Sequence, residues 1–266
     1  TSRATSRPSA PFVSTPPILL SDSHWPAVDA TRYDIAVLPW GATEPHNRHL
    51  PYGTDNHECD GIAAECARRA WSRGARVVVL PTVPFGVQTG QLDLKLAINL
   101  NPSTQARVLA DVIASVERAG IRKFLLFNGH GGNDFRQMLR ELQPTTPVFL
   151  CTLNWWQVVD ATPFFDAPGD HAGELETSVM QHLRPDTVRA LSEAGDGAEK
   201  KPTIAGFRER WVWAQRPWTT ISADTGIGDP RAASAKKGAC YVDAIAERVA
   251  QFLVELAQAD PASMYE

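Results

Sequence analysis

Short apolar runs alternate with longer amphipathic stretches along most of the chain. Four continuous apolar runs, rich in β-branched and aromatic residues, are predicted to be buried strands, at 33–40, 75–81, 122–127 and 147–153. Between them lie stretches with apolar residues at helical spacing, at 56–74, 102–120 and 133–143. Continuous apolar strands separated by helices are typical of a parallel sheet that is covered on both faces. The pattern therefore predicts an α/β fold, a three-layer α/β/α sandwich with a mostly parallel central sheet.

The beginning of the chain and one late segment depart from this alternation. Residues 1–16 are rich in Ser, Thr and Pro, and we predict a flexible arm that is disordered or lies on a partner subunit. Residues 17–266 contain no linker and are expected to form a single domain that closes with an amphipathic helix over 235–258. Residues 184–234 carry several prolines and tryptophans, and we predict irregular structure there, as a cap or an oligomer contact.

The composition narrows the class of protein. The 266 residues are 43% hydrophobic, and the net charge of -4 comes from intermixed acidic and basic residues. Without a basic stripe, we expect no nucleic-acid partner. No apolar run approaches the ~18 residues of a membrane span, and the first residues lack the apolar segment of a signal peptide. The cysteines show no CxxC spacing, which indicates reduced thiols, so we expect a cytoplasmic protein without membrane contact.

Unusual polar segments follow each of the predicted strands. The segment "GATEPHNRH" follows the first strand, "TVPFGVQTG" the second, "NGHGGN" the third and "NWW" the fourth. The carboxyl ends of parallel strands meet at one rim of the sheet, and ligands bind there in open α/β sheets. We therefore expect these four segments to converge on one site.

Glu44, His46 and Asp55 are the first candidate metal ligands. Pro45 favours an extended conformation for Glu44, and alternation in an extended chain then points Glu44 and His46 to the same side. Two carboxylates and an imidazole suit a divalent first-row metal. The alternatives are a surface loop for Glu44 and His46 and a helix N-cap for Asp55. His49 has an odd spacing from His46 and is left out of the set.

Two later segments add further candidates. His130 stands between glycines, which allow the backbone to pass close to a metal, although such a loop also suits a phosphate. In the predicted helix within 169–183, Glu176 lies on the apolar stripe, where a carboxylate must be paired or bound to metal. Glu176 is thus a candidate ligand, with a buried salt bridge as the alternative. Glu174 lies on the polar face and is either an acid/base group or a solvated side chain.

Three of these segments together resemble the creatininase (creatinine amidohydrolase) family. They are "LPWGATEPHNRHLPYGTD", "NGHGGN" and "HAGELETS", which occur in the family's order, and the resemblance covers roughly residues 17–258. It implies a parallel α/β/α fold and a two-metal centre of zinc, manganese or iron. It also implies hydrolysis of C–N bonds in small amides and a homo-oligomer, commonly a hexamer.

The resemblance also implies roles for individual residues. By position, Glu44, His46, Asp55 and His130 match metal ligands of the family, and Asp55 matches the carboxylate that bridges both ions. His171 matches a histidine that takes part in proton transfer.

The chain departs from true creatininases at several positions. Gly131 and Gly132 stand where creatininases have a tyrosine and a metal-binding glutamate, so the second ion requires another ligand, for which Glu176 is the candidate. The segment "FFDAPGDH" lacks the tryptophan that covers creatinine, and Trp155 or Trp156 is a candidate for the other substrate-facing tryptophan. These differences favour another small amide, such as a formamide or a peptide-derived amide.

We hypothesise a metal-dependent amidohydrolase in which two ions bridged by Asp55 activate a shared water as a hydroxide that attacks the amide carbonyl. One ion would polarise the carbonyl oxygen. His171 would protonate the leaving nitrogen, and Gln88, Thr89 and Gln91 are candidates for holding polar groups of the substrate. The rival hypotheses are a non-catalytic phosphate-binding or nucleotide-binding protein without metal and a scaffold with a single metal.

Overall fold

The core of the protein is a four-stranded parallel sheet with strand order β2-β1-β3-β4. The computed structural model describes residues 16–265, so the predicted arm, apart from its last residue, lies outside the described residues. The strands are β1 (Ile35–Trp40), β2 (Val77–Val79), β3 (Lys123–Asn128) and β4 (Phe149–Asn154). Each lies within or next to one of the predicted apolar runs, and the prediction of a parallel α/β fold is confirmed.

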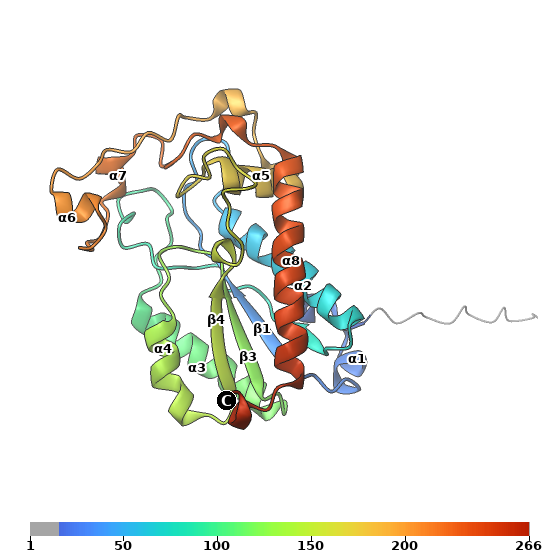
Figure 1. The fold of residues 1–266 in the computed structure, drawn as a ribbon. Coiled ribbons are helices and arrows are strands. Elements are labelled where there is room, and N and C mark those ends of the chain that lie inside the picture. The colour runs from blue at the N-terminus through green and yellow to red at the C-terminus, as the bar shows by residue number, and fades with distance from the viewer. Residues whose placement is uncertain (1–15, 266) are drawn as a thin grey trace, which may run out of the picture.

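Helices cover both faces of this sheet (Figure 1). On one face lie α2 (Thr54–Ser72) and α8 (Ala235–Gln258), and on the other lie α3 (Pro102–Arg118) and α4 (Arg136–Leu142). Because side chains of a strand alternate between faces, β1 and β3 fill two separate cores. Val37 and Phe127 pack into the core under α2 and α8, whereas Leu38 and Leu126 pack into the core under α3 and α4. The three-layer arrangement is confirmed as well.

The strand register brings three polar segments to one level. Trp40 at the end of β1 pairs with Asn128 at the end of β3, which pairs with Asn154 at the end of β4. The segments that follow these strands therefore leave the sheet side by side, as the parallel pattern predicts.

The remaining elements are one longer helix, three short helices and single turns. Helix α5 (Glu174–Leu183) packs against α2 and α8. Three helices are short: α1 (Trp25–Asp29), α6 (Ala205–Arg208) and α7 (Trp218–Ile221). Single 3-10 turns occur at Leu20–Asp22, Gln143–Thr145, Trp155–Gln157, Pro185–Thr187, Leu191–Glu193, Pro230–Ala232 and Pro261–Ser263. Residues 184–234 are mostly irregular, as predicted, and none of the described helices is long and apolar enough to cross a membrane.

Two helices begin at other positions than the sequence predicts. Helix α2 begins at Thr54 with Gly53 as the N-cap residue, so the N-cap alternative for Asp55 is wrong. Helix α4 begins at Arg136 rather than at Asn133. The amide of Asn133 is engaged in the loop after β3, where its Oδ1 accepts hydrogen bonds from Val87 N at 3.1 Å and from Gln105 Nε2 at 2.8 Å.

Helices α5 and α8 meet at a glycine. A Cβ atom on Gly238 would lie 2.0 Å from the carbonyl oxygen of Ser178, so only glycine fits at this point of α8. The Ser178 hydroxyl also accepts a hydrogen bond from Ser234 N at 3.1 Å, just before α8 begins. This contact fixes α5, which carries Glu176, against the longest helix of the protein.

We expect Gly238→Ala to destabilise the protein by about 1 to 3 kcal/mol because the added methyl group overpacks the contact with α5. This loss opposes the gain of about 1 kcal/mol that alanine normally brings to a helix interior. Urea denaturation would measure the free energy of unfolding, with Cys240→Ala on the exposed side of α8 as the control. Equal or higher stability of the Gly238→Ala variant would contradict the close packing.

Candidate metal centre

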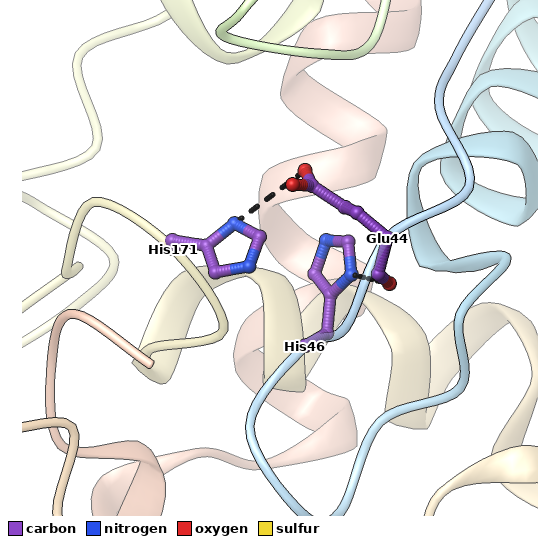
Figure 2. Close-up of side chains that lie close together, drawn as sticks. All are labelled: Glu44, His46 and His171. Atoms are coloured by element: carbon purple, nitrogen blue, oxygen red, sulfur yellow. Dashed lines mark hydrogen bonds and ion pairs between the residues drawn. The ribbon is translucent and has the colours of Figure 1, made fainter. Parts of the chain in front are cut away.

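Glu44 and His46 follow β1 and are both buried. The imidazole of His46 donates through Nδ1 to the carbonyl oxygen of Glu44 at 3.0 Å, because a carbonyl can only accept (Figure 2). Its other nitrogen, Nε2, lies 2.9 Å from Oδ1 of Asp55. The surface-loop alternative for this segment is therefore wrong, since both side chains point into the protein.

Asp55 lies between two imidazoles. Its Oδ1 faces His46, and its Oδ2 lies 3.0 Å from Nδ1 of His130. The side chain makes no cap hydrogen bond, although it stands in the first turn of α2, where the positive end of the helix dipole favours a carboxylate. One carboxylate with an oxygen toward each of two histidines has the orientation that a bridging ligand requires.

His130 comes from the glycine loop after β3. Its Nδ1 lies 2.9 Å from Oε1 of Glu44 and, as above, beside Asp55, while its Nε2 donates to the carbonyl oxygen of Val87 at 3.1 Å. A Cβ atom on Gly132 would lie 2.4 Å from His130 Nε2 and 2.4 Å from the Val87 oxygen. The glycine at this position thus permits the hydrogen bond that orients His130.

The two glutamates of α5 have different surroundings. Glu176 forms a group with His46 and Asp55 in which the nearest ligand atoms all lie within 4.8 Å of one another, and it accepts a hydrogen bond from Ala172 N. Glu174 is fully buried, pairs with Lys237 and accepts from Ala167 N at 2.7 Å. The alternative of a solvated side chain for Glu174 is therefore wrong. Glu174 also lies outside the groups of possible ligands found in the described part of the chain.

His171 stands just before α5 and faces the cluster formed by Glu44, His46, Asp55, His130 and Glu176. Its Nε2 donates to the carbonyl oxygen of Pro45 at 2.9 Å, and its Nδ1 lies 3.9 Å from Oε1 of Glu44 (Figure 2). Its ring lies 4.2 Å from the ring of His46, measured between centroids. His171 is thus held by the backbone with one nitrogen turned toward the carboxylates.

His49 lies apart from the cluster, as its spacing predicts. It is buried, and its Nε2 lies 2.8 Å from the hydroxyl of Thr177. Burial and the nearby His46 lower the pKa of His49 to about 4, so this imidazole is neutral.

The cluster is rich in negative charge and lacks a basic side chain to balance it. Within residues 16–265, Glu44, Asp55 and Glu176 form no ion pair with lysine or arginine; Glu44 and Asp55 pair with imidazoles, and Glu176 forms no ion pair. Burial opposes charge on His46, but Asp55, Glu176 and Glu44 outweigh it and raise the pKa of His46 to about 10. Burial likewise opposes charge on His130, yet Glu44 and Asp55 raise its pKa well above the usual value.

These residues fit divalent metal ions. Each of the three histidines donates one ring N–H to a backbone carbonyl, which is the outer contact that typically orients metal-binding imidazoles. The other ring nitrogen of each histidine faces carboxylate oxygens. With side chains alone, only a proton can lie between this nitrogen and the oxygens. In particular, His130 Nδ1 faces two carboxylate oxygens, and a single proton cannot satisfy both. A cation bound among these groups would supply the missing positive charge.

Glu58 is a further buried carboxyl group that the sequence reasoning missed. It lies one turn after Asp55 on α2, and neither carboxyl oxygen has a hydrogen-bond partner in the described structure. Burial, Glu176 and Asp55 raise its pKa well above the usual value, so its neutral form is favoured. Its position on the same helix face as Asp55 was visible in the sequence, but helical spacing does not reveal whether a face is buried.

A cleft of about 1200 Å³ opens beside His130. Its lining includes Gln88, Gln91, Trp213 and Trp218, and neither Trp155 nor Trp156 belongs to it. The suggestion that Trp155 or Trp156 faces the substrate therefore stays a prediction, since neither lines this cleft. Trp155 lies in the core against Tyr241, and Trp156 packs against the same core.

Trp218 is the aromatic residue that contacts the cluster. The Trp218 ring meets the ring of His171 edge to face, with 4.7 Å between centroids. The guanidinium of Arg216 lies 5.0 Å from the centroid of the Trp218 ring. Arg216 in turn pairs with Asp170, the neighbour of His171. No periodic pattern indicates this contact, although the tryptophan in the polar segment "RPWTT" was an available hint.

A parallel three-layer sandwich with buried carboxylates and imidazoles beyond its strand ends has the architecture of a metal-dependent hydrolase. The family model described as "Creatininase: Creatinine amidohydrolase" matches residues 21–253. The chain therefore belongs to the creatininase family, and the resemblance seen in its motifs is confirmed.

Individual relatives differ in what their names say they act on. The chain is 27% identical over 228 residues to the mycofactocin precursor peptide peptidase of Mycobacterium tuberculosis, across 82% of this chain and 85% of that protein. It is 27% identical over 176 residues to the creatinine amidohydrolase of Pseudomonas putida, across 58% of this chain and 66% of that protein. Both relatives are hydrolases by name, but their substrates are different.

Solved structures share the fold. A Bacteroides fragilis protein named as a creatinine amidohydrolase is 44% identical, with a TM-score of 0.89 over 95% of this chain and 100% of that one. A creatininase described as the Mn form is 23% identical with a TM-score of 0.72, over 91% of this chain and 99% of that one. A mutant creatininase of Zn-Zn type is 24% identical with a TM-score of 0.71, over 91% and 98%.

We expect Glu58→Gln to stabilise the metal-free protein at alkaline pH. The unfolded chain releases this proton near pH 4.5, whereas the folded protein retains it to higher pH. The wild type therefore loses stability as the pH rises from that value toward the folded pKa, and glutamine cannot titrate. Urea denaturation at pH 5 and pH 8 after EDTA treatment would measure the difference.

The matched control is Glu65→Gln, because Glu65 lies on the same helix and pairs with Arg69 at the surface. An advantage of Glu58→Gln over the wild type that stays constant between the two pH values would contradict a neutral Glu58.

Proposed function

We propose that the protein is a metal-dependent amidohydrolase that cleaves a C–N bond in an amide. The observation that carries this proposal is the orientation that His46, His130 and His171 share. Each gives one ring N–H to a backbone carbonyl and turns the other nitrogen toward buried carboxylates without a basic partner. The membership in the creatininase family and the Mn and Zn-Zn forms of its structural neighbours support the same chemistry.

Two sets of side chains are suited to hold two ions. Glu44, Asp55 and His130 form one set, and His46, Asp55 and Glu176 form the other, so Asp55 is shared. Glu176 in this proposal takes the place of the loop glutamate that Gly132 replaces. When bound, such ions lower the pKa of a coordinated water toward about 7 and polarise the amide carbonyl.

His171 is suited to move a proton in this reaction. The carbonyl of Pro45 fixes its tautomer and ring position, and Trp218 packs against the ring from the cleft. The free Nδ1 is then positioned to take the proton that the attacking water releases and to pass it on to the leaving nitrogen. His171 also forms a possible ligand set with Glu44 and His46, so its role as a third ligand is the competing assignment.

The substrate we propose is an amide other than creatinine, such as a formamide or a peptide-derived amide. The cleft of about 1200 Å³ is larger than the ~300 to 1,000 Å³ typical of small-molecule pockets. It therefore offers room for a substrate that extends beyond a compact ring. The name of the Mycobacterium tuberculosis relative supports an amide of peptide origin.

We also propose that residues 17–266 act as one domain and that the chain forms a homo-oligomer, with a hexamer favoured. Trp211 and Trp213 are strongly exposed, as are Leu92 and Leu96 in the loop after β2. Exposed apolar side chains in neighbouring loops are typical of subunit contacts.

We expect two divalent ions per chain in the purified protein, measured by elemental analysis for zinc, manganese and iron. Glu176→Gln is expected to lose one ion, because His46 and Asp55 alone form an incomplete set, and Asp55→Asn is expected to lose both. Glu174→Gln is the matched control, since Glu174 pairs with Lys237 instead. A protein without metal would favour the phosphate-binding hypothesis, and one ion per chain would favour the single-metal scaffold or a mononuclear enzyme.

We expect His171→Gln to reduce the turnover of a responsive formamide or cyclic amide by about 10² to 10⁴ because general acid catalysis is lost. Its metal content is expected to equal that of the wild type. A loss of metal in this variant would show that His171 is a ligand rather than a proton donor. Unchanged turnover would exclude both roles.

A further inference from the structure

Strand β4 lies at one edge of the sheet, and no strand of residues 16–265 pairs with its outer side. The backbone groups of successive residues in a strand point alternately to its two neighbours. Phe149 N donates to Arg122 O at 2.8 Å, so Phe149 and every second residue after it face β3. Leu150 and Thr152 therefore direct their N–H and carbonyl groups away from the sheet.

The beginning of this outer edge is already paired with a side chain. The Oε1 of Gln143 accepts a hydrogen bond from Leu150 N at 2.9 Å, and its Nε2 donates to Val148 O at 2.8 Å. The Gln143 amide thus pairs with β4 as the backbone of a neighbouring strand would. Further along the edge, the N–H and the carbonyl of Thr152 have no partner in the described part of the chain.

The cleft beside His130 passes across this free edge. Its lining includes Thr152 and Asn154 of β4, together with Arg136 of α4 and Arg248 of α8. Because α4 and α8 cover opposite faces of the sheet, a cleft that both helices and β4 line extends around the edge of the strand. Thr152 is only half-buried. The free edge of β4 is therefore part of the cleft.

The edge leads toward the proposed metal centre. Asn154 at the end of β4 pairs with Asn128 at the end of β3, and His130 follows two residues later. His130 lines the same cleft as Thr152. A chain that lies along the outer side of β4 would therefore extend from Thr152 toward the side chains that are proposed to bind the metal ions.

The charged lining of this cleft is mostly basic. Besides His130, it consists of Asp134, Arg136, Arg216 and Arg248. Arg216 pairs with Asp170, whereas Arg136 and Arg248 form no ion pair among the described residues. Both of these arginines are exposed, one on each side of the sheet. Acidic side chains on a strand added to β4 would thus meet positive charge on both faces.

We propose that the free edge of β4 binds an extended, acidic segment of a peptide substrate as an added strand. The N–H and the carbonyl of Thr152 pair with the peptide backbone, and acidic side chains of the peptide lie near Arg136 and Arg248. In this mode, backbone hydrogen bonds supply affinity and side chains on alternating faces supply selectivity. The inference rests on the proposed function in that it places the amide to be cleaved beside His130.

A second copy of the chain is the competing occupant, since an exposed edge strand can pair with its own equivalent. A contact of this kind is isologous, so the same arginines of both copies would approach one another. The cleft lining offers only Asp134 to offset them. An acidic peptide instead complements the charge of Arg136 and Arg248, and the observations favour it for this reason.

The test uses a blocked hexapeptide of valine and threonine with two adjacent glutamates at its centre. A second peptide carries N-methyl groups on the two glutamates, which removes an N–H from each of its edges, and a third has lysines in their place. Binding to the full chain would be measured by calorimetry. We expect the first peptide to bind at least about fivefold more tightly than either of the others, because each loses a hydrogen bond or its charge complementarity.

The variant Thr152→Pro removes the unpaired N–H and leaves the pairing with β3 intact, because proline is tolerated in an edge strand where the N–H points outward. It is expected to weaken binding of the glutamate peptide at least about fivefold. Thr152→Val is the matched control, since it keeps the N–H and changes only the side chain.

The variants Arg136→Gln and Arg248→Gln test the charge. Each is expected to weaken binding of the glutamate peptide about two- to fivefold, as for the loss of an exposed ion pair. Arg140→Gln is the control, because Arg140 is exposed on α4 but does not line the cleft. Equal effects of all three substitutions would overturn the role of the cleft arginines.

Equal binding of the three peptides by the wild type, or no binding, would overturn the proposal even if Thr152→Pro fails to fold. Discrimination that disappears after EDTA treatment would assign the glutamates to the ions and overturn it as well. A dimer in sedimentation analysis that Thr152→Pro dissociates would assign the edge to a second copy instead. Metal content and formamide hydrolysis are measured on the wild type without peptide, so the proposed function can fail while edge binding stands, and the reverse.

Discussion

The constraint on which the site depends is the presence of three carboxylates, two of them buried and one half-buried, with no lysine or arginine paired to them in the described structure. Burying a charge is costly unless it is paired; Glu44 and Asp55 pair only with imidazoles, and Glu176 forms no ion pair among the described residues. The histidines are in turn tied to backbone carbonyls, so each can offer just one nitrogen. Side chains alone leave the arrangement electrostatically incomplete, and this incompleteness, more than any single distance, supports the proposal of a metal centre at this rim of the sheet.

The fold assembles this cluster from segments that are far apart in the sequence. Parallel pairing aligns the ends of β1 and β3, so the segments bearing Glu44 and His130 leave the sheet at one level (Figure 1). Helix α2 begins immediately beyond this rim and adds Asp55 from its first turn. Helix α5 adds Glu176 from the opposite side and is fixed against α8 by the close approach at Gly238. The sheet thus positions half of the cluster, and helix packing positions the other half.

The sequence predicted the layers of the fold and the residues that face one another at the rim, because both follow from local periodicity and from the geometry of parallel strands. It could not predict the burial of a carboxyl group that stands outside the apolar stripe of its helix. Glu174 therefore looked solvated although Lys237 compensates it inside, and Glu58 was overlooked. Least could be predicted for the irregular segment 184–234, because the contact between Trp218 and His171 follows no helical or strand periodicity. Local patterns determine elements and motifs, whereas the walls of a cleft depend on contacts between distant segments.

The wall formed by Trp218 comes from a stretch of chain that takes no part in the sheet. Helices α6 and α7 and the loop between them lie outside the sheet, so their length and composition can change without disturbing the strands (Figure 1). Such a separation allows the segment beside the site to vary while the sheet is retained. Proteins of one fold can therefore act on dissimilar molecules, as the names of the two hydrolase relatives illustrate, and overall similarity is a poor guide to what each one consumes.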